Sequence, residues 1–212
     1  MPLTVKYPQG AEKQLIKSIT GKEVPSGGLP FDVGVVVQNV GTAVAIYEAV
    51  VKEKPLIERI VTVTGDGVND PKNLLVRIGT PFAAVIDYAG GLAPHKYPLK
   101  ALMGGPMMGL AQYTLDVPVI KGTSGILVIA EKSPKKMRPC VKCGSCVEIC
   151  PMNLMPNRLA DFAERDNFAE CDAYNVRDCI ECGGCTYICT SARPIVHLVK
   201  YAKLNLSKMK KP

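Results

Sequence analysis

The chain is 212 residues long and 47% of these residues are apolar, which is enough to form the buried cores of one large domain or of two to three small ones. Its formal net charge of +7 is not accompanied by a nucleic-acid recognition motif, so we do not expect it to bind nucleic acid. No apolar run of roughly 18 residues occurs, so we expect no transmembrane segment. The sequence also opens without an apolar secretory segment, and we therefore expect a reducing, cytosolic compartment.

The amino-terminal residues predict a helix, a loop and a strand. Leu15, Ile16 and Ile19 would share one face of a short helix that Gly21 can end. The segment that follows contains two prolines and two glycines within six residues, and it therefore predicts a loop. The short apolar run Val33–Val37 is typical of a buried strand.

A second helix is predicted from Val40 onward. Apolar residues recur there at helical spacing, and Asn39 is a good N-cap. Residues 38–42 would then form a strand-to-helix turn, whose unpaired backbone N–H groups could hold a phosphate. An ordinary capped helix explains the same residues, so the local sequence leaves both interpretations open.

The middle of the chain predicts a small β-grasp-like module. Arg59–Thr64 alternates as a strand, a Gly-Asp-Gly turn follows, and Leu74–Ile78 returns as a second strand. A short helix is expected to begin at Thr80 and to end at Gly90. Further strands follow, Ile126–Ile129 among them, and this order of elements favours a single small sheet with one helix.

The loop of residues 104–109, with the sequence Gly-Gly-Pro-Met-Met-Gly, differs from the rest of this module. Its glycines permit a close approach of the backbone to a neighbour or to a cofactor. A tight connection packed against the core needs the same freedom, so the sequence leaves both interpretations open.

Eight of the nine cysteines lie between residues 140 and 189, in two runs of the pattern C-x2-C-x2-C-x3-C. This is the ligand spacing of bacterial two-cluster ferredoxins, in which each run supplies three thiolates to one [4Fe–4S] cluster and its fourth thiolate to the other. We therefore expect one cluster to be bound by Cys140, Cys143, Cys146 and Cys189. We expect the other cluster to be bound by Cys179, Cys182, Cys185 and Cys150.

Other interpretations of the cysteines fit the spacing less well. A structural zinc site needs two C-x2-C pairs, and the third cysteine of each run would be superfluous for it. A disulfide framework is not favoured, because nine cysteines in 212 residues are well below the density of a small secreted scaffold. Cys171 lies outside both runs and is expected to be a buried apolar residue, and His95 and His197 are expected to be structural or surface residues.

The region around the cysteines is expected to be mostly helical. Leu159, Phe162 and Phe168 suggest helices between the two runs, and Pro194 can open a final helix. A charged linker, residues 132–139, would precede this region.

With these parts in order, the chain resembles the carboxy-terminal portion of the C subunit of the Rnf complex, the bacterial ion-translocating ferredoxin:NAD oxidoreductase. The resemblance covers nearly the whole chain. It is carried by KYPQGAEK at residues 6–13, VPSGGLP at 24–30, VVQNVGT at 36–42, the loop at 104–109 and the paired cysteine runs.

The resemblance implies an α+β multidomain fold. Residues 1–54 would be the truncated end of an α/β flavin- and NADH-binding domain similar to the NADH-binding subunit of respiratory complex I. Residues 55–131 would form an SLBB-like β-grasp module, and residues 132–139 would form a linker. Residues 140–203 would form a mostly helical two-cluster ferredoxin-like domain, followed by a basic tail at residues 204–212.

The resemblance also places Gly10, Glu12, Asn39 and Thr42 near the flavin or the nicotinamide. The glycine-rich nucleotide loop of the family lies further upstream, and none precedes Tyr7 here. This chain alone is therefore expected to lack a complete FMN or NADH site, and FMN and NAD(H) are expected only in a full-length form.

The resemblance implies an electron-transfer subunit of a membrane-bound complex that couples electron flow between ferredoxin and NAD to ion translocation. The subunit would have no catalytic side chain of its own. Its partners would be the other subunits of that complex and a ferredoxin-type redox protein, and it would lie peripherally on the cytoplasmic side of the membrane. A cobalamin reductase of a microcompartment resembles the same modules, and a non-catalytic docking module is an alternative of another class.

Overall fold

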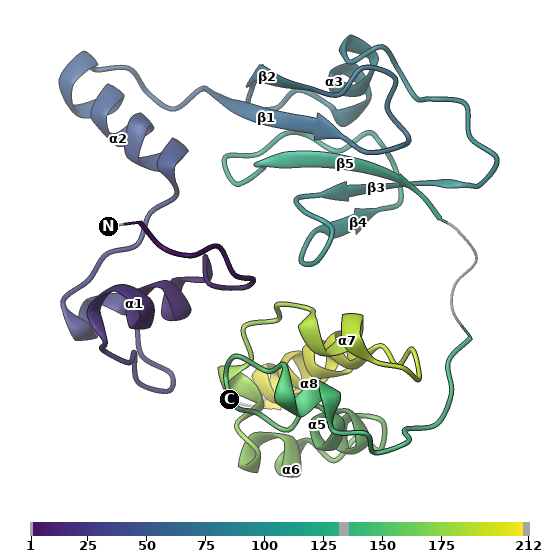
Figure 1. Ribbon diagram of the computed structural model, residues 1–212. Coiled ribbons are helices and arrows are strands. Elements are labelled where there is room, and N and C mark those ends of the chain that lie inside the picture. The colour runs from purple at the N-terminus through teal and green to yellow at the C-terminus, as the bar shows by residue number, and fades with distance from the viewer. Residues whose placement is uncertain (1, 132–135, 210–212) are drawn as a thin grey trace. The chain divides into compact units, whose positions relative to one another are not determined.

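The computed structural model describes residues 2–131 and 136–209 (Figure 1). The chain forms two compact units. Residues 38–134 make up the first, which we call the sheet unit, and residues 1–37 together with 135–212 make up the second, which we call the cysteine unit. Residues 132–135 of the predicted linker lie outside the described residues, and residues 136–139 have no regular secondary structure.

The sheet unit contains one five-stranded sheet with the strand order β2-β1-β5-β3-β4 (Figure 1). The two strands β1 and β5 run parallel, and the other neighbours are antiparallel. Its elements are β1 (Glu58–Thr64), β2 (Lys72–Arg77), α3 (Phe82–Tyr88), β3 (Leu99–Met103), β4 (Leu110–Gln112) and β5 (Gly125–Ala130). The predicted strands near residues 59–64, 74–78 and 126–129 and the predicted helix between Thr80 and Gly90 are therefore confirmed.

The core of this unit lies between the sheet and helix α3. Val61 and Val63 point to the same side of β1, because side chains alternate along a strand, and both are fully buried. They pack in one cluster with Phe82 and Ile86 of α3 and with Ile126 of β5. The alternating apolar pattern thus fixes which face of the sheet the helix covers.

The glycine-rich loop of residues 104–109 connects β3 to β4. The N–H of Gly109 donates a hydrogen bond of 2.8 Å to the carbonyl of Gly105, and a Cβ atom on Gly109 would lie 2.4 Å from that oxygen. The close approach that the glycines permit is therefore made within the loop itself, as expected for a tight connection between two strands.

Helix α2 (Val40–Lys52) precedes the sheet in the chain, and its predicted start is confirmed. The side chain of Asn39 accepts a hydrogen bond of 2.9 Å from the N–H of Gly41, which satisfies one of the unpaired donors at the helix start. None of the residues of α2 is buried, although its sequence is largely apolar.

In the cysteine unit, the amino-terminal residues form helix α1 (Glu12–Thr20) and the 3-10 helix η1 (Pro30–Val33). Gly21 ends α1 in the left-handed conformation, as predicted. The prediction of a strand at Val33–Val37 is wrong. Val33 ends η1, Gly34 is left-handed with φ of 75°, and residues 35–37 have no regular structure. An apolar run becomes a strand only where a second strand satisfies its backbone groups, and no described strand pairs with these residues.

The remaining elements of the cysteine unit are helical: α4 (Ser145–Glu148), α5 (Pro156–Ala163), α6 (Phe168–Ala173), η2 (Val176–Asp178), α7 (Gly184–Ile188) and α8 (Ile195–Met209). The predicted helices between the cysteine runs and after Pro194 are thereby confirmed. Helix α8 also includes residues 204–209 of the predicted basic tail, and residues 210–212 lie outside the described residues. Among the residues that the structure describes, no helix has both the length and the apolar character needed to cross a membrane.

Candidate metal centre

The two cysteine runs have the same local backbone. The residue two places after the first cysteine is left-handed in both runs, Lys142 with φ of 55° and Glu181 with φ of 57°. A left-handed glycine, Gly144 or Gly183, comes directly before the short helix of each run. The repeated spacing in the sequence therefore produces a repeated loop in the structure.

Each of these loops directs a backbone N–H group at a sulfur atom. The N–H of Lys142 donates to Cys140 Sγ and the N–H of Glu181 donates to Cys179 Sγ, both at 3.4 Å. Such hydrogen bonds favour the negatively charged form of sulfur. In both loops, the residue whose N–H donates to the sulfur, Lys142 or Glu181, has the left-handed backbone conformation.

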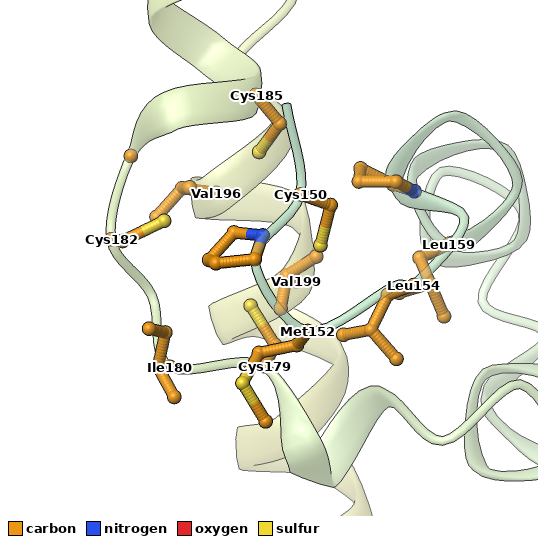
Figure 2. Close-up of a pocket in the computed structure, with 13 residues that line it drawn as sticks. Cys150, Met152, Leu154, Leu159, Cys179, Ile180, Cys182, Cys185, Val196 and Val199 are labelled. Carbon is orange, nitrogen blue, oxygen red and sulfur yellow. The ribbon is translucent and has the colours of Figure 1, made fainter. Parts of the chain in front are cut away.

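Two small cavities lie beside these loops, and each is lined by cysteines from both runs. The first cavity is lined by Cys179, Cys182, Cys185 and Cys150. Figure 2 shows these four residues, with Cys150 on one segment and the other three on another. The second cavity is lined by Cys140, Cys143, Cys146 and Cys189.

The walls of the two cavities differ. The first is otherwise lined mainly by apolar side chains, among them Leu154 and Leu159 and, from α8, Val196 and Val199 (Figure 2). The second is also lined by polar side chains such as Asn157 and Arg193. Because reduction potentials depend on burial and on nearby hydrogen bonds, two redox groups in these cavities would differ in potential.

Burial shifts the pKa values of several of these thiols. Burial raises the pKa of the Cys185 thiol to about 12, and the negative charges of neighbouring Cys179 and Cys182 add to this shift. Burial likewise raises the pKa values of Cys179 and Cys146. Cys143 is exposed, and a hydrogen bond with the Ser145 side chain lowers its pKa.

This donor set can be tested against an iron–sulfur cluster. Buried thiols with raised pKa values become thiolates when a cation compensates their charge, and four cysteines on the wall of one cavity are the donor set of a [4Fe–4S] cluster. The residues that line each cavity therefore fit such a group. Within residues 2–131 and 136–209, no three His, Cys, Asp or Glu side chains converge closely enough to hold a single metal ion.

Lys203 of α8 supports the loop of the second run and was not singled out by the sequence. Its Nζ donates to the carbonyl of Cys179 at 2.6 Å and to Glu181 Oε1 at 2.9 Å. The lysine thereby fixes the loop to α8 and places a positive charge beside Cys179. Only its position on the predicted final helix, four residues after Val199, could have suggested that it faces this loop.

Arg193 has a related role beside the second cavity, where the residue is buried at 4% exposure. It forms ion pairs with Asp161 at 2.9 Å and with Glu164 at 2.8 Å, both carried by the α5 segment. These pairs tie the chain after Cys189 to α5. A buried arginine four residues after a cysteine run carries no local sequence signal that would have predicted it.

The amino-terminal segment also contacts the cysteine loops. The hydroxyl of Tyr7 donates to the carbonyl of Cys182, and Gln14 Nε2 donates to the carbonyl of Pro151 at 2.9 Å. A third cavity of about 780 Å³ lies between this segment and the end of the first cysteine run, and Tyr7, Gln14, Cys150 and Pro151 are among the residues that line it. The family resemblance had placed Gly10 and Glu12 of this segment near the flavin or the nicotinamide, and it did not predict contacts with the cysteine loops.

Comparisons with known proteins give the context of these features. The family model of the Nuo51 FMN-binding domain matches residues 1–48, and that of the SLBB domain matches residues 60–111. Over 204 residues, which is 95% of this chain, the sequence is 52% identical to the C subunit of the proton-translocating ferredoxin:NAD(+) oxidoreductase complex of Clostridium ljungdahlii. The chain belongs to the family of Rnf complex C subunits.

Other members of the family match in the same way. The C subunit of the Na(+)-translocating ferredoxin:NAD(+) oxidoreductase complex of Acetobacterium woodii is 50% identical over 95% of the chain, and the C subunit of the ion-translocating oxidoreductase complex of Rhodobacter capsulatus is 48% identical over 73%. The chain spans less than half the length of these relatives, with 44% of the Clostridium protein, 45% of the Acetobacterium protein and 30% of the Rhodobacter protein covered.

The four residues that the Rnf resemblance associates with the flavin lie within the match to the FMN-binding domain. Gly10 is exposed just before α1, and Glu12 is the first residue of that helix. Asn39 and Thr42 lie at the start of α2. The first pair belongs to the cysteine unit and the second to the sheet unit, so the four are not brought together within either unit.

The remaining predicted residues lie where the sequence suggested. Cys171 is fully buried in the cluster of apolar side chains between α5, α6 and α8, and its Sγ donates weakly to the carbonyl of Leu159 at 3.7 Å. His95 and His197 are exposed.

Proposed function

We propose that this chain is the part of an Rnf C subunit that transfers electrons through two [4Fe–4S] clusters. The complex would be membrane-bound and would couple electron flow between ferredoxin and NAD to ion translocation. The observation that carries the proposal is the lining of the two cavities, because the fourth cysteine of each run lines the cavity of the other run. This crossed arrangement is the one expected of two-cluster ferredoxins.

The cysteines and their neighbours would hold the two clusters, which supply one-electron transfer when bound. Cys179, Cys182, Cys185 and Cys150 would bind one of them, and Cys140, Cys143, Cys146 and Cys189 the other. Lys203 and Arg193 keep the loops in place, and the apolar walls of the first cavity exclude water. The role of the protein is thus to position the two redox groups and to set their potentials.

The rest of the chain suggests how this part is connected. The match of residues 1–48 to an FMN-binding domain supports a flavin and NAD(H) site in a full-length form, to which Gly10, Glu12, Asn39 and Thr42 would contribute. The sheet unit would serve as the SLBB β-grasp module of the subunit. The subunit would lie peripherally on the cytoplasmic side of the membrane, bound to the other subunits and to a ferredoxin-type partner.

Iron content and electron paramagnetic resonance (EPR) test the proposal. The chain prepared without oxygen should contain about eight iron and eight sulfide per molecule, as expected for two four-iron clusters. Cys150→Ala and Cys182→Ala should abolish the same EPR signal, and Cys146→Ala and Cys189→Ala should abolish the other. Cys171→Ala is the matched control and should leave iron content and both signals unchanged, because Cys171 lies in a separate apolar cluster.

Three outcomes would contradict the proposal. Protein that binds zinc in place of iron would show that the donor set serves a structural site. A Cys150→Ala variant that loses the signal lost in Cys146→Ala would show that each run binds its own cluster. Isolation from host membranes together with the other subunits tests the assignment to a membrane complex, and recovery apart from any membrane complex would refute it.

A further inference from the structure

We propose that the cluster bound by Cys150, Cys179, Cys182 and Cys185 is the one next to the flavin side of the protein, and that the other cluster faces the external electron carrier. This inference rests on the proposed function, since it requires that both clusters are present. It concerns the order of the two clusters, which the spacing of the cysteines does not determine.

The first argument comes from the hydrogen bonds made by the amino-terminal segment, residues 2–37. The hydroxyl of Tyr7 donates directly to the carbonyl of Cys182. Gln14 Nε2 donates to the carbonyl of Pro151 at 2.9 Å and approaches Met152 Sδ at 3.1 Å, and these two residues follow Cys150. This segment is therefore hydrogen-bonded to Cys182 itself and to the residues directly after Cys150, and both cysteines belong to the same set.

A third contact lies beside Cys179. The hydroxyl of Ser26 donates to the carboxylate of Asp178, with Oγ–Oδ1 and Oγ–Oδ2 distances of 2.7 and 2.8 Å, and Asp178 directly precedes Cys179. All three contacts therefore involve one cysteine set. Residues 1–48 match an FMN-binding domain, so the segment that makes these contacts would belong to the flavin side of a full-length form.

The second argument comes from the cavities. The cavity of about 780 Å³ beside the amino-terminal segment has Cys150 in its wall, and among the described residues that line it there is no cysteine of the other set. The cavity of Cys140, Cys143, Cys146 and Cys189 is lined by residues of positions 140–195 and that of the Cys182 set by residues of positions 150–199, so the amino-terminal segment reaches the Cys182 set through the third cavity and through the hydrogen bonds described above. Cys143 is exposed to solvent, so the Cys140 set is accessible to a partner protein.

The electron balance of the transfer is simple. A bound flavin would supply the step from NADH, taking its hydride and giving up the two electrons one at a time with release of the proton to water, while the cysteines would keep their bonds to each cluster as it gains one electron. In the opposite direction the same electrons return to the flavin. Electron transfer slows with distance, so the cluster next to the flavin side should be the relay for the other.

The decisive experiment uses the complex isolated from its host, with NADH as the reductant and EPR as the readout. In a Cys182→Ala variant, the signal of the Cys140 set should no longer appear with NADH but should still appear with dithionite. In a Cys143→Ala variant, the signal of the Cys182 set should still appear with NADH. The reverse pattern would overturn the inference, and so would normal NADH reduction of the remaining cluster in both variants.

A milder variant tests the contact itself without removing a ligand. Tyr7→Phe removes the hydroxyl that donates to Cys182, and hydrogen bonds at cluster ligands set the potential. A redox titration of the chain should show a shift to lower potential for the signal that Cys182→Ala abolishes, and none for the other. Tyr187→Phe is the matched control, because Tyr187 lies in α7 beside the cysteines with 76% of its surface exposed.

The two proposals fail in different ways. If the chain shows no iron–sulfur signals at all, the proposed function fails. If both signals are present but Tyr7→Phe shifts only the signal that Cys143→Ala abolishes, or shifts neither, the order of the clusters proposed here is wrong.

Discussion

Replacement of Arg193 by methionine should destabilise the cysteine unit by about 2 to 3 kcal/mol, because it removes a charge-assisted hydrogen bond to Glu164 and an ion pair with Asp161 from a buried guanidinium. The pairs have N–O distances of 2.9 Å to Asp161 and 2.8 Å to Glu164, and the arginine side chain is only 5% exposed. Breaking a fully buried ion pair would cost about 3 to 5 kcal/mol. The two carboxylates here are 36% and 42% exposed, so water can solvate them after the change and the loss is smaller.

This loss raises the equilibrium constant of unfolding about 30- to 140-fold, at about 1.4 kcal/mol per tenfold change. Urea titration without oxygen, followed by circular dichroism, measures it. The matched control is Arg177→Met, since Arg177 pairs with Asp172 at 2.6 Å but both side chains are exposed, at 38% and 41%. The control should lose less than about 1 kcal/mol. Equal losses in the two variants would refute the argument that burial of Arg193 makes its pairs strong.

Two further predictions concern thiol chemistry and backbone strain. In the metal-free chain near neutral pH, iodoacetamide should modify Cys143 first and Cys185 last, because a lowered pKa gives more thiolate at Cys143 and a raised pKa keeps Cys185 protonated. Mass spectrometry of the peptides measures the order of modification. A faster reaction at Cys185 than at Cys143 would contradict the prediction. Gly65→Ala should destabilise the sheet unit by about 3 kcal/mol or more, because φ is +116° and the new Cβ would lie 1.9 Å from the carbonyl oxygen of Val128. Gly79→Ala, with φ of +97° and no atom within 4 Å, should lose only about 1 to 2 kcal/mol in the same urea titration, and equal losses would show that the contact with Val128 is unimportant.

The elements that the sequence predicted well are those whose cause is local. The strand at residues 59–64 and the helix after Asn39 follow from alternation and from capping, and both are present. The strand predicted at Val33–Val37 failed because a strand depends on a partner elsewhere in the chain, and an apolar run does not reveal whether one exists. Helix α2 shows the same limit, since its apolar residues recur at helical spacing but none of them is buried.

The spacing of eight cysteines alone predicted the candidate metal centre and its crossed pairing, because ligand spacing is a property of consecutive residues and of the cluster chemistry that they suit. The binding of clusters by these residues stays a prediction, which the two cysteine-lined cavities support. Only the tertiary structure decided which distant side chains surround these loops. Tyr7, Arg193 and Lys203 reach them from other parts of the cysteine unit. Such contacts depend on how the amino-terminal segment, α5 and α8 pack, and this long-range packing leaves no periodic signal in the sequence around each residue.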